Sequence, residues 1–430
     1  MTKTLALCFA AALALTARAQ SDDAVRTITV TVENPLNEAR TDAPVVISLH
    51  PSLAGHQQLE QPAPTGGQER GVRSAVVREN GNEIPCQLDD LDGDRRYDEL
   101  CFVTNLARRE KKTFTIELSA KGRPRHYEPR VFIEMVLPNS KQKAKNKQDR
   151  YISEITAERG VDAYRIQHHH GVAFESELTA YRIYFDHRQS VDLYGKKHKQ
   201  LELRETQFYP DADQLARGYG DDVLWCGQTF ALGAFRGWNG SAPTTMDDAE
   251  RRTQRIIARG PVRVIAETVC EDWNAPCRTA GAEPITVRER YTQWAGHRDV
   301  QVDVVLSRPV PDYDFSTGII NVKGSKAFSD GKGLRGCWGS DYTVSGKDTL
   351  THAKETVGLG ICIPQRFVKK ELPADKDNYG FVVATPSDRL TYHITFTSDK
   401  ETFGYHNDRD WFAALKQWKR ELEPLKIEVR

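Results

Sequence analysis

The sequence lacks the features that would place it at once in several common functional classes. Its formal net charge is zero, because sixty lysine and arginine residues balance sixty aspartate and glutamate residues. No net positive field is therefore present to recruit phosphate groups, which excludes attachment to nucleic acid or to an anionic membrane by bulk charge. Beyond residue 20, no apolar run is long enough to span a bilayer, so no transmembrane segment is expected.

Several catalytic and cofactor motifs are also missing. The sequence contains no serine nucleophile elbow, no P-loop, no dinucleotide-binding fingerprint and no HExxH motif. Serine hydrolase, kinase and dehydrogenase functions therefore lack support. No CxxC motif or paired Cys/His spacing indicates a zinc site. We expect no required cofactor.

Cysteine is scarce, with eight residues in 430. Seven remain if the N-terminal segment that contains Cys8 is removed, and an odd number forbids complete pairing. Cys270 and Cys277 flank a short loop, and Cys86 and Cys101 bracket a predicted hairpin. Either pair could form a disulfide in an oxidising compartment, and the sequence leaves the connectivity open.

The first twenty residues predict export. Lys3 is followed by an apolar stretch over residues 5–15 and by a small-x-small sequence that ends at Ala19. This arrangement is typical of a secretory signal peptide over residues 1–19, cleaved near Ala19. We therefore expect a periplasmic or secreted protein.

The rest of the chain has the composition and patterning of a β protein. Apolar residues make up 39% of the sequence, which is enough for a hydrophobic core and excludes a disordered chain. Short alternating segments, separated by Gly, Pro, Asn and Asp clusters, predict a small β-sandwich domain over residues 20–125. Residues 126–430 hold about a dozen more such segments, too many for one ordinary sandwich. We expect a mainly all-β protein, with a large antiparallel β domain after the small one.

A helix is expected near the C-terminus. Trp411, Leu415 and Trp418 recur at helical spacing, together with Phe412, after a candidate N-cap at Asp408. This pattern predicts a terminal amphipathic helix whose tryptophans anchor it to the core.

The segment DDLDGDRRYDEL is the most specific local pattern. It places carboxylates at alternating positions around Gly93, and alternate acidic oxygens that converge on one point suit Ca²⁺. We expect such an ion to have a structural role. The alternative is an acidic hairpin turn that is simply solvated. The candidate ligands are Asp90, Asp92, Asp94 and Asp98.

A histidine trio is the first part of the richest polar constellation. His168, His169 and His170 precede Gly171. In an extended chain His168 and His170 would share one side while His169 points away. Histidine titrates near neutral pH, so either of the first pair is a candidate general base.

The next segment, residues 174–185, is predicted to be one strand with no apolar face. Side chains of Glu175, Glu177 and Tyr181 would share one face, and those of Arg182 and Tyr184 the other. Such a strand is either a solvated edge strand or a strand that lines a groove for a polar substrate.

The surrounding residues favour the groove. A sugar ring places its C–H groups on aromatic faces and needs polar partners for its hydroxyl groups. Aromatic and basic residues that could supply both kinds of contact are frequent between residues 184 and 238. The candidate substrate-binding residues are Trp225, Arg236, Trp238, Arg188 and Tyr184.

The acidic segment and the segment from the histidine trio to DLYGKK together resemble a known family. The chain resembles domain-of-unknown-function family 4861, a secreted bacterial family, over nearly all of its mature length. The resemblance implies a place in polysaccharide-utilisation systems, often beside enzymes that act on uronic-acid-containing glycans. The large β part is also similar to the supersandwich fold of galactose mutarotase and of several polysaccharide lyases. That similarity is an analogy of fold, which does not fix function, and the family brings no assigned catalytic residues.

The leading hypothesis is an exported lyase that acts on a uronate-containing glycan. β-Elimination needs a group that neutralises the uronate carboxylate, a base for the C5 proton and an acid for the leaving oxygen. Arg182 or Arg188 could be the first. The base could be His168 or His170, and the acid could be Tyr181 or Tyr184.

Three alternatives remain open. A glycoside hydrolase could use Glu175 and Glu177, because residues two apart on a strand lie about 6.5–7 Å apart, compatible with paired carboxylates. A non-catalytic glycan-binding protein would need the aromatic residues but no titrating pair. A mutarotase-like epimerase would need only two opposed acid/base groups.

Overall fold

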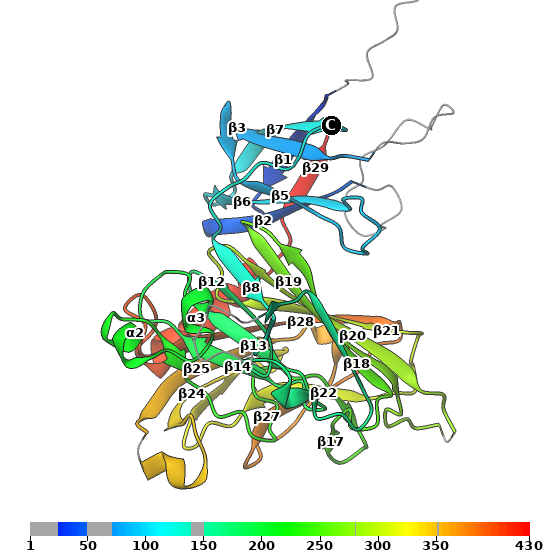
Figure 1. Cartoon of the computed structure of the whole chain (residues 1–430), viewed down its shortest axis with the longest axis vertical. Helices are drawn as coiled ribbons and strands as arrows, with labels where there is room; N and C mark the ends of the chain where they lie inside the picture. The colour runs from blue at the N-terminus through cyan, green and yellow to red at the C-terminus, as the bar shows by residue number, and fades with distance from the viewer. Residues whose placement is uncertain (1–24, 50–70, 139–149, 280, 351) are drawn as a thin grey trace, which may run out of the picture.

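A computed structural model describes residues 25–49, 71–138 and 150–430, apart from 280 and 351. The predicted signal peptide lies outside these ranges and stays a prediction. Within them, no helix combines the length and the apolar character needed to cross a membrane. The described chain is mainly β, with several antiparallel sheets and a helix near the C-terminus, which confirms the predicted fold class (Figure 1).

The first part of the chain forms two sheets that enclose their own core. In strand β1, Ile28, Val30 and Val32 are buried while the threonines between them point outward, the alternation expected of a sheet with one covered face. The core includes Phe102 and Phe114, whose rings lie 4.9 Å apart. One sheet has the order β29 (Lys426–Val429), β1 (Arg26–Glu33), β7 (Lys111–Ser119), β3 (Ser74–Glu79) and β4 (Asn82–Ile84); the other has the order β2 (Arg40–Ser48), β6 (Glu99–Leu106) and β5 (Cys86–Asp89).

The last strand departs from the expected division of the chain. The sequence placed residues 126–430 together, but β29 pairs antiparallel with β1, with Val429 opposite Val30. Figure 1 shows this red strand among the blue and cyan strands of the small sandwich. The two ends of the described chain therefore share one sheet, a pairing between segments that lie too far apart in the sequence for local patterns to reveal.

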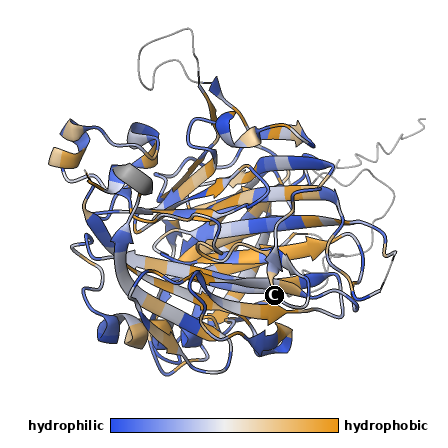
Figure 2. Ribbon diagram, turned by 90° about the horizontal axis from the view of Figure 1, so that it is seen from below, coloured by the Kyte–Doolittle hydropathy of each residue, from blue (hydrophilic) through white to orange (hydrophobic). Residues whose placement is uncertain are grey.

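The rest of the chain is organised around one large sheet. Figure 2 shows hydrophobic and hydrophilic residues alternating along its strands. The order of this nine-stranded sheet is β11 (Glu154–Glu158), β18 (Arg251–Arg259), β19 (Arg263–Trp273), β20 (Ile285–Trp294), β21 (Val300–Leu306), β28 (Arg389–Ser398), β25 (Lys354–Cys362), β24 (Leu334–Tyr342) and β23 (Lys326–Ser329).

Two five-stranded sheets complete this part, and one core cluster combines residues of all three sheets, including Phe174, Val302 and Phe381. A short pair, β9 (Val136–Leu137) and β10 (Arg150–Tyr151), lies apart from them. The first five-stranded sheet has the order β15 (Asp221–Asp222), β14 (Val191–Gly195), β13 (Ala180–Tyr184), β12 (Gly171–Ser176) and β8 (Val131–Glu134); the second has the order β17 (Pro243–Thr244), β16 (Arg236–Trp238), β22 (Phe315–Ile320), β27 (Asn378–Val383) and β26 (Val368–Glu371).

The predicted single strand over residues 174–185 is instead a hairpin. Strands β12 and β13 are joined by a tight turn in which the Ser176 amide donates to the Thr179 carbonyl (3.0 Å). Both strands are buried along their whole length, and β13 lies in the middle of its sheet. The solvated-edge interpretation is therefore wrong. The turn contains no Gly, Pro or Asn, the residues that usually mark a turn, so the sequence pattern predicted one continuous strand across it.

The C-terminal helix α3 (Asp408–Glu421) is present as predicted, with its N-cap one residue earlier. The Asn407 side chain, rather than that of Asp408, accepts from the Asp410 amide (2.9 Å). Trp411 is buried and donates from Nε1 to the Leu359 carbonyl (3.1 Å). The helix lies close to the sheet because Gly336 and Gly360 beneath it have no side chain; a Cβ there would meet Leu415 at 2.3 and 2.4 Å. Two shorter helices, α1 (Leu203–Thr206) and α2 (Ala212–Ala216), precede β15.

The seven described cysteines are all free thiols, and six of them are buried. Neither of the two disulfides considered from the sequence is formed. The fold is therefore stabilised in the described residues by packing and polar contacts rather than by cross-links.

Candidate functional site

A buried arginine on β13 organises the polar centre of the site. Arg182 lies opposite Asp192 of β14 in the strand register, and its side chain is 4% exposed. Its Nε and one terminal nitrogen donate to Asp192 Oδ2 at 2.9 and 2.6 Å. The guanidinium also donates to the Tyr209 hydroxyl (2.6 Å) and to Asp222 Oδ2 (3.0 Å). Because every side of the group is engaged, Arg182 fixes the positions of three other functional side chains.

Two carboxylates share this single guanidinium. Asp192 is almost fully buried and also accepts from the Tyr184 hydroxyl (2.6 Å), whereas Asp222 is partly exposed. Burial and the neighbouring Asp192 carboxylate raise the pKa of Asp222 well above its ordinary value. Asp222 therefore has the character of a proton donor. Burial likewise raises the pKa values of Tyr184 and Tyr209, so both phenols keep their protons.

His170 is held in the tautomer that a general base needs. Its Nδ1 lies 2.9 Å from the Tyr164 carbonyl oxygen, which can only accept, so Nδ1 carries the proton and Nε2 keeps its lone pair. The ring stacks on Tyr164, with centroids 4.0 Å apart and planes 5° apart. Burial lowers the pKa of His170, which favours the neutral ring at pH 7. Its backbone φ of 67° is left-handed, a conformation that this tightly packed loop maintains.

The other two histidines have different surroundings. His169 is fully buried between Glu134 Oε1 (3.2 Å) and the Gly171 carbonyl (2.8 Å). The rings of His168 and His170 both contact the Tyr209 ring, with centroids 6.2 and 6.5 Å away. The predicted alternation required an extended chain, whereas residues 168–170 form a turn in which His170 has a left-handed backbone; the shared contact with Tyr209 arises from this turn.

These side chains form one partly exposed surface, which we call the His170 patch and define as Tyr164, His168, His170, Tyr184, Arg188 and Tyr209. Its most exposed member is Tyr209, at 38%. The Arg188 guanidinium lies over the Tyr164 and Tyr184 rings, 5.1 and 5.0 Å from their centroids, and pairs with Asp186. The patch thus combines aromatic faces, a guanidinium and a neutral imidazole.

Trp225 stands in the chain between two residues that bind the carboxylates of Asp222 and Asp192. Its side chain is 48% exposed. The Leu224 amide donates to Asp222 Oδ1 (3.1 Å), and the Cys226 thiol lies 3.1 Å from Asp192 Oδ1. An exposed indole beside these groups is consistent with the predicted substrate-binding role.

Arg236 and Trp238 do not join the patch through any described contact. Arg236 is buried, and its guanidinium donates to the carbonyls of Gln228 (3.1 Å) and Thr229 (2.6 Å). Burial lowers its pKa to about 10. Its contacts support a role in holding a loop rather than in binding substrate. Trp238 is half-buried two residues further along β16.

Three predicted catalytic residues lie away from the patch. Tyr181 is fully buried on the opposite face of β13 from Arg182, and its hydroxyl donates to the Arg298 carbonyl. Glu177 pairs with Arg130 (2.5 Å) and accepts from the Gly296 amide (2.8 Å). Neither side chain has a described hydrogen bond, ion pair or ring contact with a member of the His170 patch, so the structure does not bring either of them to that site.

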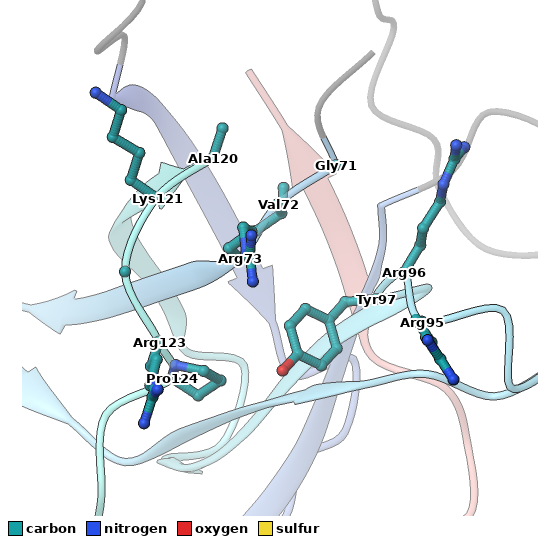
Figure 3. A pocket seen from close by; sticks show the side chains of 11 residues that line it. Gly71, Val72, Arg73, Arg95, Arg96, Tyr97, Ala120, Lys121, Arg123 and Pro124 are labelled. Carbon is teal, nitrogen blue, oxygen red and sulfur yellow. The ribbon is translucent and has the colours of Figure 1, made fainter. Parts of the chain in front are cut away.

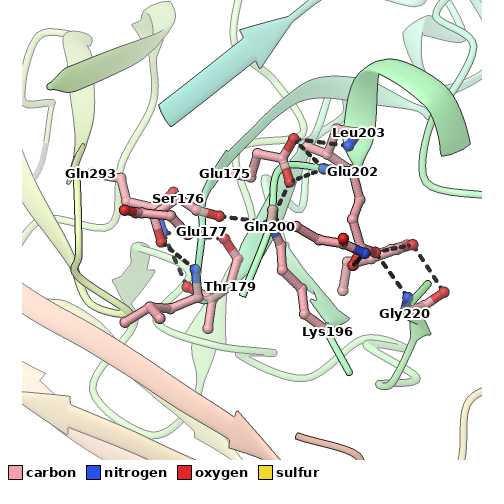
Figure 4. Close-up of polar contacts among 12 residues, drawn as sticks. Glu175, Ser176, Glu177, Thr179, Lys196, Gln200, Glu202, Leu203, Gly220 and Gln293 are labelled. Carbon is pink, nitrogen blue, oxygen red and sulfur yellow. Dashed lines mark hydrogen bonds and ion pairs between the residues drawn. The ribbon is translucent and has the colours of Figure 1, made fainter. Parts of the chain in front are cut away.

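Glu175 belongs to a buried structural network (Figure 4). Its carboxylate is fully buried against the Lys196 ammonium. It also accepts from the backbone amides of Glu202 (2.9 Å) and Leu203 (2.8 Å), at the start of α1. The proposed pair of Glu175 and Glu177 is therefore not an acid/base pair facing a substrate.

The acidic loop between β5 and β6 brings together three of its four predicted ligands. Carboxylate oxygens of Asp90, Asp92 and Asp98 lie within 4.8 Å of one another, whereas Asp94 is not part of this group. Such a group of hard oxygen donors fits Ca²⁺. The same oxygens also hold the loop's own backbone: Asp90 accepts from two loop amides, and Asp98 accepts from the Leu91 amide (2.5 Å). The calcium interpretation stays a prediction.

A second cluster was not foreseen from the sequence. His297, Asp299, Trp411 and Trp418 line a cavity of about 260 Å³ between the β20–β21 turn, the β1–β2 segment and α3. Although burial lowers the pKa of His297, the adjacent Asp299 raises it above its ordinary value. Both ring nitrogens are engaged, one by Asp299 (3.1 Å) and one by the Asp42 carbonyl (2.9 Å). This ring therefore joins the two parts of the chain and is not available as a base.

The comparisons with known proteins identify the family. A family model described as "Domain of unknown function (DUF4861)" matches residues 32–427. The chain belongs to this family. No curated protein matches it.

Among solved structures, the chain is similar to an alpha-mannosidase from Enterococcus faecalis V583, with a TM-score of 0.44 and 10% identity over 94% of this chain and 46% of that one. A protein in the glycosyl hydrolase family 38 from Enterococcus faecalis gives a TM-score of 0.44 and 10% identity over 94% and 47%. The chain spans about half the length of these structures. A likeness this weak says nothing about activity.

Sequence patterns did not single out the carboxylates that complete the site of this family member. Asp192 and Asp222 meet at Arg182 only because β13, β14 and β15 are neighbours in one sheet. Tyr164, which fixes the tautomer of His170, lies in a one-turn 3-10 helix, Ala163–Arg165. The one available signal was a pair of acidic residues, Asp221 and Asp222, close to an aromatic-rich segment.

Proposed function

We propose that this protein processes a uronic-acid-containing glycan at the His170 patch by β-elimination. The observation that carries the proposal is the hydrogen bond from His170 Nδ1 to the Tyr164 carbonyl, which leaves Nε2 as a proton acceptor on a ring that packs edge-on to Tyr209 and stacks on Tyr164, the ring over which Arg188 lies. The expected link between the family and polysaccharide utilisation adds to this support.

The patch holds a group for each part of the reaction. His170 Nε2 would remove the C5 proton of the uronate, and the electrons of the broken C–H bond would form the C4–C5 double bond as the C4–O bond breaks. The leaving oxygen would take a proton from the Tyr209 hydroxyl, which burial keeps protonated by raising its pKa, and which Arg182 orients. Arg188, whose guanidinium is held by Asp186 but is more exposed than that of Arg182, would face the uronate carboxylate.

Arg182 has a positioning role in this scheme. Its guanidinium is fully engaged by Asp192, Asp222 and Tyr209, so it would orient the acid and not touch the substrate. This assignment differs from the sequence-based one, in which Arg182 itself neutralised the carboxylate. Aromatic rings at Tyr164, Tyr209 and Trp225 would receive the C–H faces of the sugar.

The test is an assay with a panel of pectic, ulvan-type and glucuronic-acid-capped oligosaccharides, followed by ultraviolet absorbance and product mass. A lyase forms an unsaturated uronide, which absorbs in the ultraviolet. We expect such a product from the wild-type protein and from His406→Gln, a control at an exposed histidine. His170→Gln should lose the activity without losing the fold.

Other outcomes would contradict elimination. Reducing ends without absorbance would indicate hydrolysis and would make Asp222, with its raised pKa, the candidate acid. Binding without any product would indicate a glycan-binding protein.

A further inference from the structure

The small sandwich contains a pocket that is lined by none of the residues of the His170 patch. It has a volume of about 750 Å³ and lies between the segment that leads into β3, the β5–β6 loop and the segment that follows β7. Figure 3 shows the side chains of Arg73 and Tyr97 in its middle, with Arg123 on one side and Arg95 and Arg96 on the other. We call it the basic pocket.

All the charged side chains that line the basic pocket have the same sign. Four of them are arginines, Lys121 is the fifth, and no described acidic residue lines it. In the whole chain the two signs balance, so composition alone does not predict such a pocket. A concave surface with one sign of charge attracts and concentrates oppositely charged ligands.

The four guanidinium groups have no competing partner in the part of the chain that the structure describes. The guanidinium groups of Arg73, Arg95, Arg96 and Arg123 form no ion pair or hydrogen bond with a described residue. Arg125, two residues beyond Arg123, lies outside the pocket and pairs with Glu83 (3.5 Å). The pocket arginines are therefore available to a ligand without first breaking an ion pair.

The acidic residues next to Arg95 and Arg96 are turned into the loop. Asp90 accepts from the amides of Gly93 (2.7 Å) and Arg95 (2.8 Å), and Asp94 accepts from the Arg96 amide (2.7 Å). These bonds hold Arg95 in a left-handed conformation with φ of 72°. The loop thus uses its carboxylates for its own backbone and presents its guanidinium groups to the pocket.

We propose that the basic pocket binds a segment of an anionic polysaccharide through its carboxylate or sulfate groups. Its volume far exceeds that of a single small anion, and its charges come from three separate segments, which suits a ligand with several spaced charges. The half-buried Tyr97 ring offers a sugar an apolar face. A single aromatic residue favours a glycan over single-stranded nucleic acid, whose sites stack successive bases on several rings.

The test measures binding of the full chain to oligogalacturonate, to a sulfated oligosaccharide and to methyl-esterified oligogalacturonate of the same length. We expect binding of the two anionic ligands, and a loss of about tenfold or more in the double variant Arg73→Gln/Arg123→Gln. Arg125→Gln is the matched control and should bind like wild type. Because both substituted side chains are exposed and neither has a described hydrogen bond or ion pair, the melting temperature of the double variant should match that of wild type.

Four results would overturn the proposal: equal affinity for the esterified ligand, unchanged affinity in the double variant, equal binding of inorganic sulfate alone, or tighter binding of an oligonucleotide of the same charge. His170→Gln should retain this binding. Failure of the β-elimination assay would therefore leave the basic pocket intact, and failure of the binding test would leave the His170 patch intact.

Discussion

Replacement of Lys196 by methionine should destabilise the fold strongly. Its ammonium group is fully buried and donates to Glu175 Oε2 and to the carbonyls of Ser176 (2.6 Å) and Gln200 (2.6 Å). Methionine keeps most of the volume and removes the charge. The Glu175 carboxylate would then stay in the core with only backbone amides as donors.

The expected loss of stability is large because only one partner of a buried ion pair is removed; replacement of both partners can be nearly neutral. Removal of one partner of such a pair costs about 3–5 kcal/mol, because the remaining charge stays desolvated. For a domain of about 300 residues, with an unfolding entropy of about 2.1 cal/mol/K per residue, that corresponds to a fall in melting temperature of roughly 5–8 °C. Differential scanning calorimetry would measure it, with Lys376→Met as the control, since the Lys376 side chain is 89% exposed.

A double-mutant cycle with Glu175→Gln separates structure from catalysis. The double variant should lose less stability than the two single variants added together, because it leaves no unpaired buried charge. At a temperature at which it is folded, Glu175→Gln should keep its turnover. A melting temperature for Lys196→Met equal to that of wild type would refute this reasoning, as would a stable Glu175→Gln variant without activity.

Three further predictions concern other parts of the molecule. Glu289 is fully buried, and burial raises its pKa from 4.5 to about 7; folding therefore favours its protonated form, and the stability that this gives is present below pH 4.5 and lost as the pH rises through 7. Wild type should therefore lose about 3 kcal/mol of its free energy of unfolding between pH 4.5 and pH 8, and Glu289→Gln should not show this loss. A difference in melting temperature between wild type and Glu289→Gln that stays constant between pH 5 and 8 would contradict this. Cys277 is the one partly exposed thiol among the seven described cysteines, so a thiol reagent should label one of these seven rapidly in the native protein and none in Cys277→Ser; rapid labelling of a second would show that the buried thiols are accessible. Calcium should raise the melting temperature of wild type but not of Asp92→Asn, whereas a wild-type melting temperature unaffected by calcium and chelator would count against an ion at the acidic loop.

Local patterns predicted the elements whose cause is local. The alternation in β1 and the helical spacing of Trp411, Leu415 and Trp418 each reflect burial of one face of a single element. In each case, the information lay within a few residues of the chain.

The features that the sequence did not predict depend on contacts between residues far apart in the chain. The pairing of β29 with β1 depends on two ends of the chain that no local pattern connects. The partners of Arg182 follow from the order of strands in a sheet, so Asp192 and Asp222 could not be assigned to it in advance. Glu175 looked catalytic because a buried ion pair with Lys196, twenty-one residues away, leaves no trace in the spacing of charges.

The central claim is that His170 is a general base at a glycan-processing site, and the pH dependence of product formation tests it most directly. The initial rate of ultraviolet-absorbing product from a uronate oligosaccharide should be flat near neutral pH, because burial lowers the pKa of His170 and keeps the ring unprotonated there. The rate should fall only in acid, and His170→Gln should abolish it. An unimpaired rate in His170→Gln, or no product from any uronate glycan, would contradict the account.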